Sequence, residues 1–143
     1  MINARGETVA EKPSFRSAVK SRRCLIPADG FYEWHREGSV KIPYFISLAS
    51  EEPFAFAGLW EQWRSKETDD SLETATLVTT QANDFLAPLH HRMPVILDRD
   101  RADRWLAGDD EPRASAGDTA GGGVADHVHL GVVAADLHPG ARH

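Results

Sequence analysis

Two short segments carry side chains that can move protons. Glu33 stands in an aromatic run from Phe31 to Trp34, where a carboxylate is costly to bury without a partner. A glutamate held in such a setting suits proton transfer near neutral pH. His90 and His91 precede Arg-Met-Pro, and adjacent histidines in a loop can serve acid–base catalysis or bind a metal. These residues alone leave the simpler alternative open, in which Glu33 is an ordinary surface residue and the histidines are structural or exposed.

Other chemistries find little support in the residues. The single cysteine, Cys24, excludes an internal disulfide and a Cys-rich zinc site, and it is typical of a reducing cytoplasm. The alternating histidines in 126–129 have the spacing of metal ligands but lack supporting carboxylates, so we expect no metal and no cofactor. The sequence contains no P-loop, GxGxxG or GxSxG pattern, which disfavours a nucleotide-dependent enzyme and an α/β-hydrolase.

The bulk composition is that of a soluble globular protein. Hydrophobic residues make up 41% and charged residues 27% of 143 residues, with no apolar run long enough for a bilayer and no signal peptide. The net charge of −6 means that binding to nucleic acid would need a local basic groove. Candidates for it are Arg5, Arg16, Lys20, Arg22, Arg23 and Arg92, each of which could equally be a solvated surface charge. The aromatic candidates for stacking on bases are Trp34, Trp60, Trp63 and Trp105, with core packing as the alternative.

The elements that position these residues are mostly strands. Apolar and alternating patterns predict strands at residues 31–34, 44–48, 54–60, 74–80 and 95–97. Two helices are predicted, one over 15–21 capped by Ser14, and one from Asp98 or Asp100 to Leu106 that Gly108 ends. Residues 27–30 form a predicted turn, while 64–71 and 90–94 read as loops. The fold class is therefore α+β and rich in β-structure.

The chain divides into a folded part and a tail. We expect one domain over residues 1–107. The segment 108–143 is rich in glycine, alanine and aspartate and is predicted to be a low-complexity, disordered tail. Within it, residues 124–137 allow a weak strand.

Three segments together resemble the signature blocks of the SRAP (SOS response-associated peptidase) family. Ile2–Glu7 is similar to its INARxE block, Cys24–Trp34 ends in its PADGFYEW block, and His90–Leu97 begins with its HxRMP block. The blocks occur in the family's order and with similar spacing, and the resemblance covers residues 1 to about 107. It implies an SRAP-type compact fold of mixed and antiparallel strands with a few short helices and a basic groove for single-stranded DNA.

The resemblance also implies an activity, which is the processing of abasic sites in the DNA damage response. An N-terminal cysteine attacks the ring-opened aldehyde of an abasic site, and its thiol and α-amine close a thiazolidine that links protein and DNA. Removal of a leader by the same cysteine accounts for the family's peptidase label. The implied partner is single-stranded DNA with abasic sites, bound by a cytoplasmic monomer.

Site residues follow from the resemblance position by position. Asn3 resembles the asparagine that orients the cysteine and the DNA, Glu33 the glutamate that shuttles protons, and His90 the histidine that handles protons at the sugar hydroxyl.

For the DNA contacts, Arg5 and Arg92 resemble arginines that grip the flanking phosphates. Thr79 matches a position that touches the DNA strand.

The chain also departs from the family pattern. Relatives begin with Met-Cys-Gly-Arg well before the INARxE block, whereas Met1 falls directly on that block here. Cys24 is internal and has no free α-amine, so it cannot replace the nucleophile. We therefore expect an N-terminally truncated member that is inactive in crosslinking. Two alternatives stay open: a non-catalytic module that binds single-stranded DNA, and an unrelated small hydrolase that uses Glu33 and His90.

Overall fold

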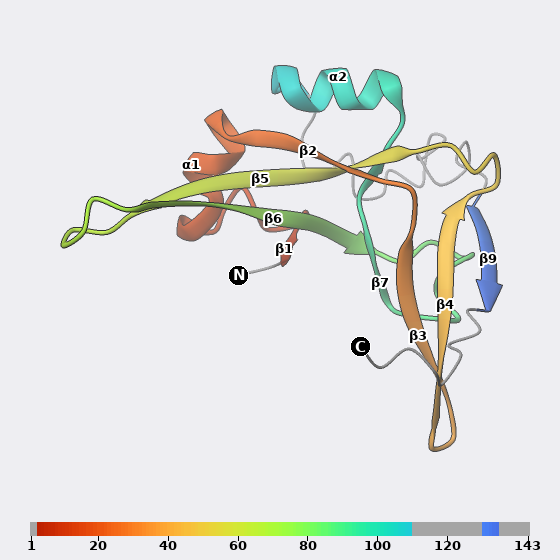
Figure 1. The fold of residues 1–143 in the computed structure, drawn as a ribbon. Helices are drawn as coiled ribbons and strands as arrows, with labels where there is room; N and C mark the ends of the chain where they lie inside the picture. The colour runs from red at the N-terminus through yellow and green to blue at the C-terminus, as the bar shows by residue number, and fades with distance from the viewer. Residues whose placement is uncertain (1–2, 110–129, 135–143) are drawn as a thin grey trace.

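The computed structural model describes residues 3–109 and 130–134 and shows two sheets that meet at a corner (Figure 1). The strands are β1 Asn3–Arg5, β2 Arg23–Ala28, β3 Phe31–Glu37, β4 Val40–Leu48, β5 Phe54–Arg64, β6 Ser71–Gln81, β7 Arg92–Pro94, β8 Ile96–Leu97 and β9 Leu130–Ala134. The helices are α1 Pro13–Ser21 and α2 Arg99–Ala107. This strand-rich architecture with short helices confirms the predicted fold class.

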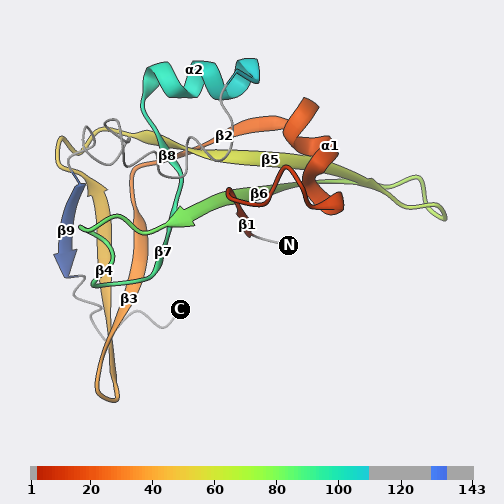
Figure 2. The same cartoon turned by 180° about the vertical axis from the view of Figure 1, so that it is seen from behind.

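The larger sheet has the order β1–β6–β5–β2, with β1 parallel to β6 and the other pairs antiparallel. Strand β7 pairs with β6 and β8 pairs with β5, so this segment fills the space where β5 and β6 diverge. At its centre the Val95 N–H donates to the Val78 carbonyl, and the Val95 carbonyl accepts from the Ala57 N–H. Figure 2 shows β7 and β8 running as one segment past the end of β6. The end of β6 therefore lies between β1 and β7.

The smaller sheet has the order β3–β4–β9 and stands upright at one end of the larger sheet (Figure 1). Strand β9 pairs antiparallel with β4, with Leu130 opposite Leu48 and Ala134 opposite Tyr44. Strand β9 falls within residues 124–137, where the sequence allows a weak strand. These residues belong to the segment 108–143 that was predicted to be a tail. The rest of that tail lies outside the described residues, as do the alternating histidines of 126–129.

Each face of the larger sheet covers its own hydrophobic core. One face packs under the two helices, and Phe15, Ala18 and Val19 of α1 contribute to that core together with Trp105 of α2. The other face packs against the smaller sheet and the segment before β7, through residues such as Phe56. The second core therefore lies at the corner between the sheets.

Helix ends follow elementary capping rules in one case and not in the other. Asp98 caps α2 by accepting a hydrogen bond from the Arg101 N–H, and Gly108 ends it with a positive φ of 82°, as predicted. The predicted cap of α1 is wrong, because Lys12 is the N-cap residue and Ser14 lies inside the helix. Pro13 begins this helix, where its missing N–H has no intrahelical partner to lose.

A predicted turn and a predicted loop are each strand in part. The turn predicted at 27–30 begins later, because Pro27 and Ala28 still pair with β5. The loop predicted at 90–94 contains β7, since β6 offers a free edge to residues 92–94. The prediction failed in both places because the deciding partner is a distant strand rather than a local signal.

Replacing Gly30 with alanine should destabilise the fold. A Cβ at this position would overlap the Phe45 ring and lie 2.8 Å from the Ile46 carbonyl oxygen, so the backbone must shift. Overpacking of this kind typically costs about 1–3 kcal/mol. Urea unfolding of Gly30→Ala should show this loss, with Ser39→Ala at the exposed β3–β4 turn as the control. Equal stabilities of the two variants would contradict the packing described.

Candidate functional site

Strand β1 presents two polar side chains on one face. Asn3 and Arg5 are exposed, while Ala4 between them is buried in the core under the helices. In register, Asn3 lies beside Leu77 and Arg5 beside Thr79. Because paired residues of neighbouring strands share a face, Asn3, Arg5 and Thr79 point to the side on which the smaller sheet packs.

An ion pair joins the two segments that flank the end of β6. Arg92 donates from both terminal nitrogens to the Glu7 carboxylate, at 2.7 and 2.9 Å. Its Nη2 also donates to the Thr79 carbonyl at 3.0 Å and lies 3.1 Å from the Thr79 Oγ1. The Gly6 N–H donates to the same Thr79 carbonyl. This cluster, Glu7–Thr79–Arg92, fixes β1 and β7 on either side of β6.

The cluster reduces the ability of the Arg92 guanidinium to bind a phosphate. Its side chain is 17% exposed and its two terminal nitrogens are occupied within the protein. A guanidinium bound bidentately to a carboxylate is largely neutralised, so it attracts a phosphate less than an exposed arginine does. Arg5 lies on the same face and is exposed. The structure therefore favours Arg5 over Arg92 as a cation available to a ligand.

His90 is half-buried and oriented by its own loop. Its Nδ1 lies 3.0 Å from both the backbone nitrogen and the carbonyl oxygen of Arg92, so it accepts from the N–H in one tautomer and donates to the oxygen in the other. Its ring stacks on that of His91, with centroids 4.6 Å apart. The loop itself is closed by a hydrogen bond from the His90 N–H to the Leu86 carbonyl. The imidazole is thus held directly beside the Arg92 backbone.

Glu33 and Trp34 occupy opposite faces of β3. Glu33 is half-buried and lies two residues beyond Phe31, which packs against Phe56 in the corner core. Trp34 and Tyr32 point outward, with exposed fractions of 49% and 57%. This alternation is that of the strand predicted at 31–34. The alternation gives β3 a carboxylate on the inner face and an aromatic platform on the outer face.

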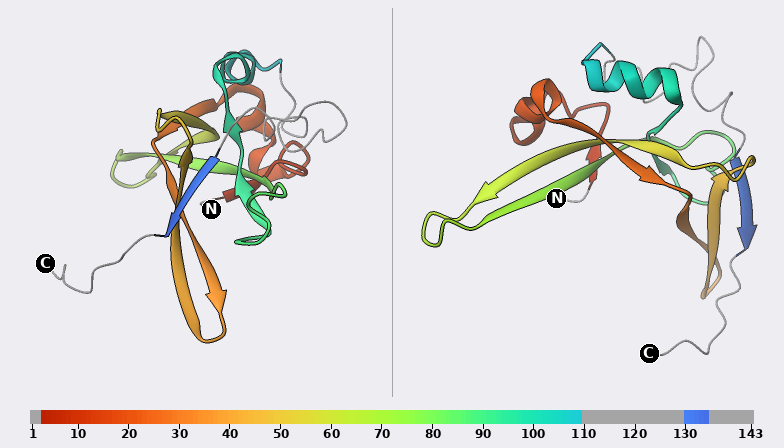
Figure 3. Two further views of the ribbon diagram at one scale, coloured as in Figure 1. Left: turned by 90° about the vertical axis from the view of Figure 1, so that its right-hand side faces the viewer. Right: turned by 45° about the horizontal axis from the view of Figure 1, so that its top comes forward.

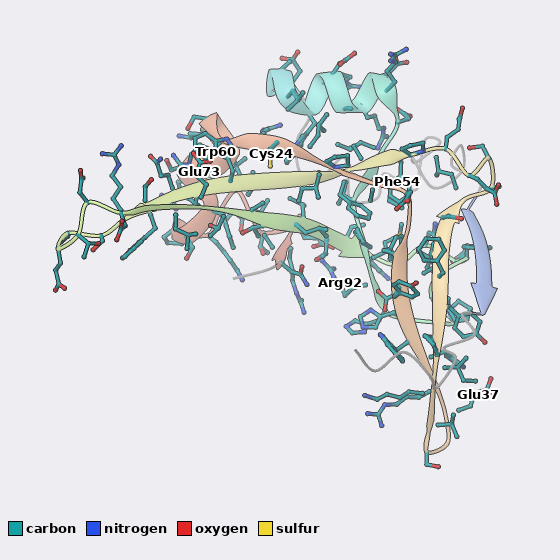
Figure 4. The ribbon with its side chains drawn as sticks, in the orientation of Figure 1. Cys24, Glu37, Phe54, Trp60, Glu73 and Arg92 are labelled. Carbon is teal, nitrogen blue, oxygen red and sulfur yellow. The ribbon has the colours of Figure 1, made fainter. Side chains whose placement is uncertain are left out.

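The segments that carry the predicted site residues lie around the corner between the two sheets. Arg92 lies near the end of β6 in Figure 4, where it pairs with Gln81. Leu86 and Leu89, which precede His90, pack in the same corner core as Phe31. The six predicted positions therefore come from β1, β3, β6 and the β7 segment, and all of these border the corner.

Three of the other candidates, Arg22, Arg23 and Trp105, have structural contacts away from the corner. Arg22 pairs with Glu61 at 2.7 Å, and Arg23 lies over the Trp105 ring at 4.4 Å. These arginines pack beside the helices rather than along the corner. Cys24 lies in β2, and burial raises the pKa of its thiol, so it is a poor nucleophile.

Glu7 is the residue whose importance the sequence did not reveal. It belongs to the INARxE block, but its partner Arg92 is 85 positions away and no local pattern connects the two. The hydrogen bond from Arg92 lowers the pKa of the Glu7 carboxyl, and burial opposes this only in part.

The lowered pKa of Glu7 predicts a pH dependence. Because the carboxyl titrates lower in the folded than in the unfolded chain, its contribution to stability is present above the unfolded pKa and is lost as pH falls through the folded pKa. The Glu7 side chain is 38% exposed, so solvent screening limits the pair to about 1 kcal/mol. The stabilities of wild type and Glu7→Gln in urea should therefore differ at pH 6, and the difference should shrink as pH falls below the unfolded pKa. Glu37→Gln at the exposed end of β3 should match wild type throughout, and a constant difference for Glu7→Gln would refute the ion-pair explanation.

Among the described residues, no helix has both the length and the apolar character needed to cross a membrane. In the same part of the chain, no three potential metal-ligating side chains come together.

Comparison with known proteins identifies the family of the chain. A sequence model described as SOS response associated peptidase (SRAP) matches residues 1–129. The chain is 52% identical over 107 residues to abasic site processing protein YoaM of Bacillus subtilis, covering 74% of this chain and 47% of YoaM. It is 36% identical to abasic site processing protein HMCES of Gallus gallus over 124 residues, 73% of this chain and 37% of HMCES. A crystal structure of a protein from Bacteroides thetaiotaomicron superimposes with a TM-score of 0.79 at 33% identity, covering 92% of this chain and 57% of that one.

A corner of two curled sheets that carries the INARxE, PADGFYEW and HxRMP residues defines an SRAP-type fold. The chain belongs to the SRAP family, as its sequence blocks predicted. It spans about half the length of the bacterial relative YoaM.

Proposed function

We propose that this chain binds single-stranded DNA at abasic sites, as part of abasic site processing, through the corner between its two sheets. The observation that carries the proposal is the shared orientation of Asn3, Arg5 and Thr79 on one face beside His90. Such a face offers an exposed guanidinium for a phosphate and an amide for a sugar oxygen. The names of the relatives, abasic site processing proteins, support the choice of ligand.

Within this site the half-buried side chains supply proton transfer. Glu33 and His90 approach the corner from β3 and from the loop before β7. Opening of an abasic sugar to its aldehyde moves a proton from the C1 hydroxyl to the ring oxygen, which is a task for one acid and one base. We assign these two residues to that exchange, and we assign Asn3 to orienting the sugar. Arg92 positions the loop of His90 while it stays bound to Glu7.

Covalent capture requires a thiol and an amine on one carbon framework, and these 143 residues contain one thiol, that of Cys24. That thiol lies within β2, and its pKa is raised by burial. We therefore expect these 143 residues on their own to hold the abasic strand without a covalent bond. Peptidase self-processing would need the same nucleophile, and we do not assign it to this polypeptide.

The test mixes the purified chain with labelled single-stranded DNA carrying one abasic site, and runs native and denaturing gels. The proposal expects a shifted band in the native gel and none after heating in denaturant. Undamaged single strands should bind more weakly, and duplex DNA more weakly still. A heat-stable band would show that another group forms an adduct, and no native shift at low salt would overturn the proposal.

Trp34 should contribute to binding by stacking on an unpaired base. Its ring is exposed on the outer face of β3, one residue after Glu33, and stacking of a base on an aromatic ring is worth about 1–3 kcal/mol. Trp34→Ser should weaken binding to single-stranded DNA roughly 10-fold or more by fluorescence anisotropy, which corresponds to about 1.4 kcal/mol. Trp63 is 61% exposed but lies near the far end of β5, so Trp63→Ser is a matched control that should bind normally. Equal losses in the two variants would remove Trp34 from the site.

A further inference from the structure

The hairpin of β5 and β6 extends well beyond the body of the protein. Figure 1 shows it reaching past α1, and the right-hand view of Figure 3 shows the same projection from another side. We call residues 60–76 the arm. The pairing of β2 with β5 ends at Leu59, and the pairing of β1 with β6 begins at Leu77. At its base Trp60 and Glu61 still bind Arg22, and beyond them the described strands of the arm form ladders only with each other.

The arm exposes large apolar side chains despite its lack of cover. Trp63 and Leu72 lie directly opposite each other and are 61% and 57% exposed. They continue the face that carries Leu59, which is buried under the helices at 1% exposure. A face that is packed at one end and bare at the other indicates that the helices cover only part of it.

The opposite face of the arm is hollowed. Trp60, Glu73, Thr74 and Ala75 line an open depression of about 450 Å³. Figure 4 shows Trp60 and Glu73 close together where the arm leaves the body. The arm therefore offers an apolar pair on one face, a depression on the other, and backbone groups along both edges.

A two-stranded ribbon with exposed apolar side chains has little stability of its own in water. An isolated two-stranded hairpin is marginally stable, and unpaired strand edges are templates for another strand. A tryptophan buries up to about 150–250 Å² when it is covered, so the Trp63–Leu72 pair is an apolar surface suited to a partner. The physical features match recognition by strand addition, in which main-chain hydrogen bonds and alternate side chains both contribute.

The lengths of the relatives indicate which polypeptide covers the arm. The matched region covers 47% of YoaM, and the superimposed region covers 57% of the Bacteroides thetaiotaomicron protein and 65% of one from Bordetella bronchiseptica. Those proteins therefore contain further polypeptide that is available to pack on the same fold. One face of the body is covered by α1 and α2 and the other by the smaller sheet. Among the described residues, the arm beyond Glu61 keeps both strand edges without a neighbouring strand, and its Trp63–Leu72 pair is uncovered.

We propose that the arm is a docking surface for polypeptide equivalent to the part of YoaM that lies outside the match. This polypeptide adds a strand to a free edge of the arm and covers Trp63 and Leu72. The proposal does not depend on DNA binding. The arm then binds the further polypeptide, and the corner binds DNA.

The test co-expresses the full 143-residue chain with a tagged polypeptide that comprises the YoaM residues outside the match. The proposal expects a one-to-one complex that survives gel filtration. Replacing the exposed pair, Trp63→Ser with Leu72→Ser, should weaken the complex at least 10-fold. Val40→Ser is the matched control, since Val40 is 58% exposed at the start of β4 in the other hairpin. Absence of a complex, or equal retention by the double variant, would overturn the proposal.

Hydrogen exchange of the wild-type chain locates the interface directly. This measurement does not depend on whether the double variant folds. Backbone amides of residues 60–64 and 71–76 should gain protection in the complex, while those of 36–41 in the other hairpin should not. Protection confined to other segments would place the interface elsewhere and overturn the proposal. The chain alone could instead form a dimer that the double variant does not form. That result would identify a second copy of the chain as the partner of the arm and would also overturn the proposal.

Discussion

Trp105→Ala should lower the free energy of unfolding by about 3–5 kcal/mol, the cost of truncating a large buried aromatic side chain. Trp105 is 0% exposed and holds α2 against the larger sheet. Its Nε1–H donates to the Cys24 carbonyl at 3.1 Å, and the Arg23 guanidinium lies 4.4 Å from the ring centroid. A loss of this size is a large fraction of the stability of a small domain. Urea unfolding followed by far-UV circular dichroism measures it.

Two variants show whether the loss comes from the buried ring. Leu106 is the next residue and is 51% exposed, so Leu106→Ala should change stability by less than about 0.5 kcal/mol. Trp105→Phe keeps a ring but loses the hydrogen bond to Cys24, and should fall between the two. If Trp105→Ala proved as stable as Leu106→Ala, the packing of α2 described above would be incorrect.

Arg5→Ala should weaken binding to single-stranded DNA about 10-fold, which is about 1.4 kcal/mol. The reason is that Arg5 is exposed on the site face, whereas the terminal nitrogens of Arg92 are held by Glu7. Loss of one phosphate contact should also reduce the slope of log K against log salt by about 0.7. Fluorescence anisotropy at several salt concentrations measures both quantities.

The control is an arginine of equal charge away from the corner. Arg64 is exposed at the end of β5 in the arm, so Arg64→Ala removes the same charge from the whole molecule. It should leave affinity and salt slope close to wild type. An equal decrease in the two variants would mean that binding reflects net charge rather than the face of β1.

Much of the fold was predictable because its signals are local. The alternation along 31–34 predicted a strand, in which Glu33 and Trp34 lie on opposite faces, and the Asp98 cap with the Gly108 end defined α2. The family blocks also brought Asn3, Glu33 and His90 together as candidates, and the structure places all three segments at one corner. These features depend on period, capping and motif, which a single sequence contains.

The parts that could not be predicted depend on distant partners. Strand β7 is a strand only because β6 and β5 diverge around it, and the sequence of 90–94 reads as a loop. The ion pair of Glu7 with Arg92 joins residues 85 positions apart. The arm was also underestimated, because the charged residues of 64–71 favour a loop, whereas cross-strand pairing continues to Arg64 opposite Ser71.

The central claim is that the corner between the two sheets is the DNA site of this SRAP chain. The most direct measurement is titration of the ¹⁵N-labelled chain with single-stranded DNA that carries one abasic site, followed by amide chemical shifts. The account predicts the largest changes at residues 3–5, at 79 and at 90–92, with little change along the arm at 61–73. Changes confined to the arm or to the helices, with the corner unaffected, would contradict it.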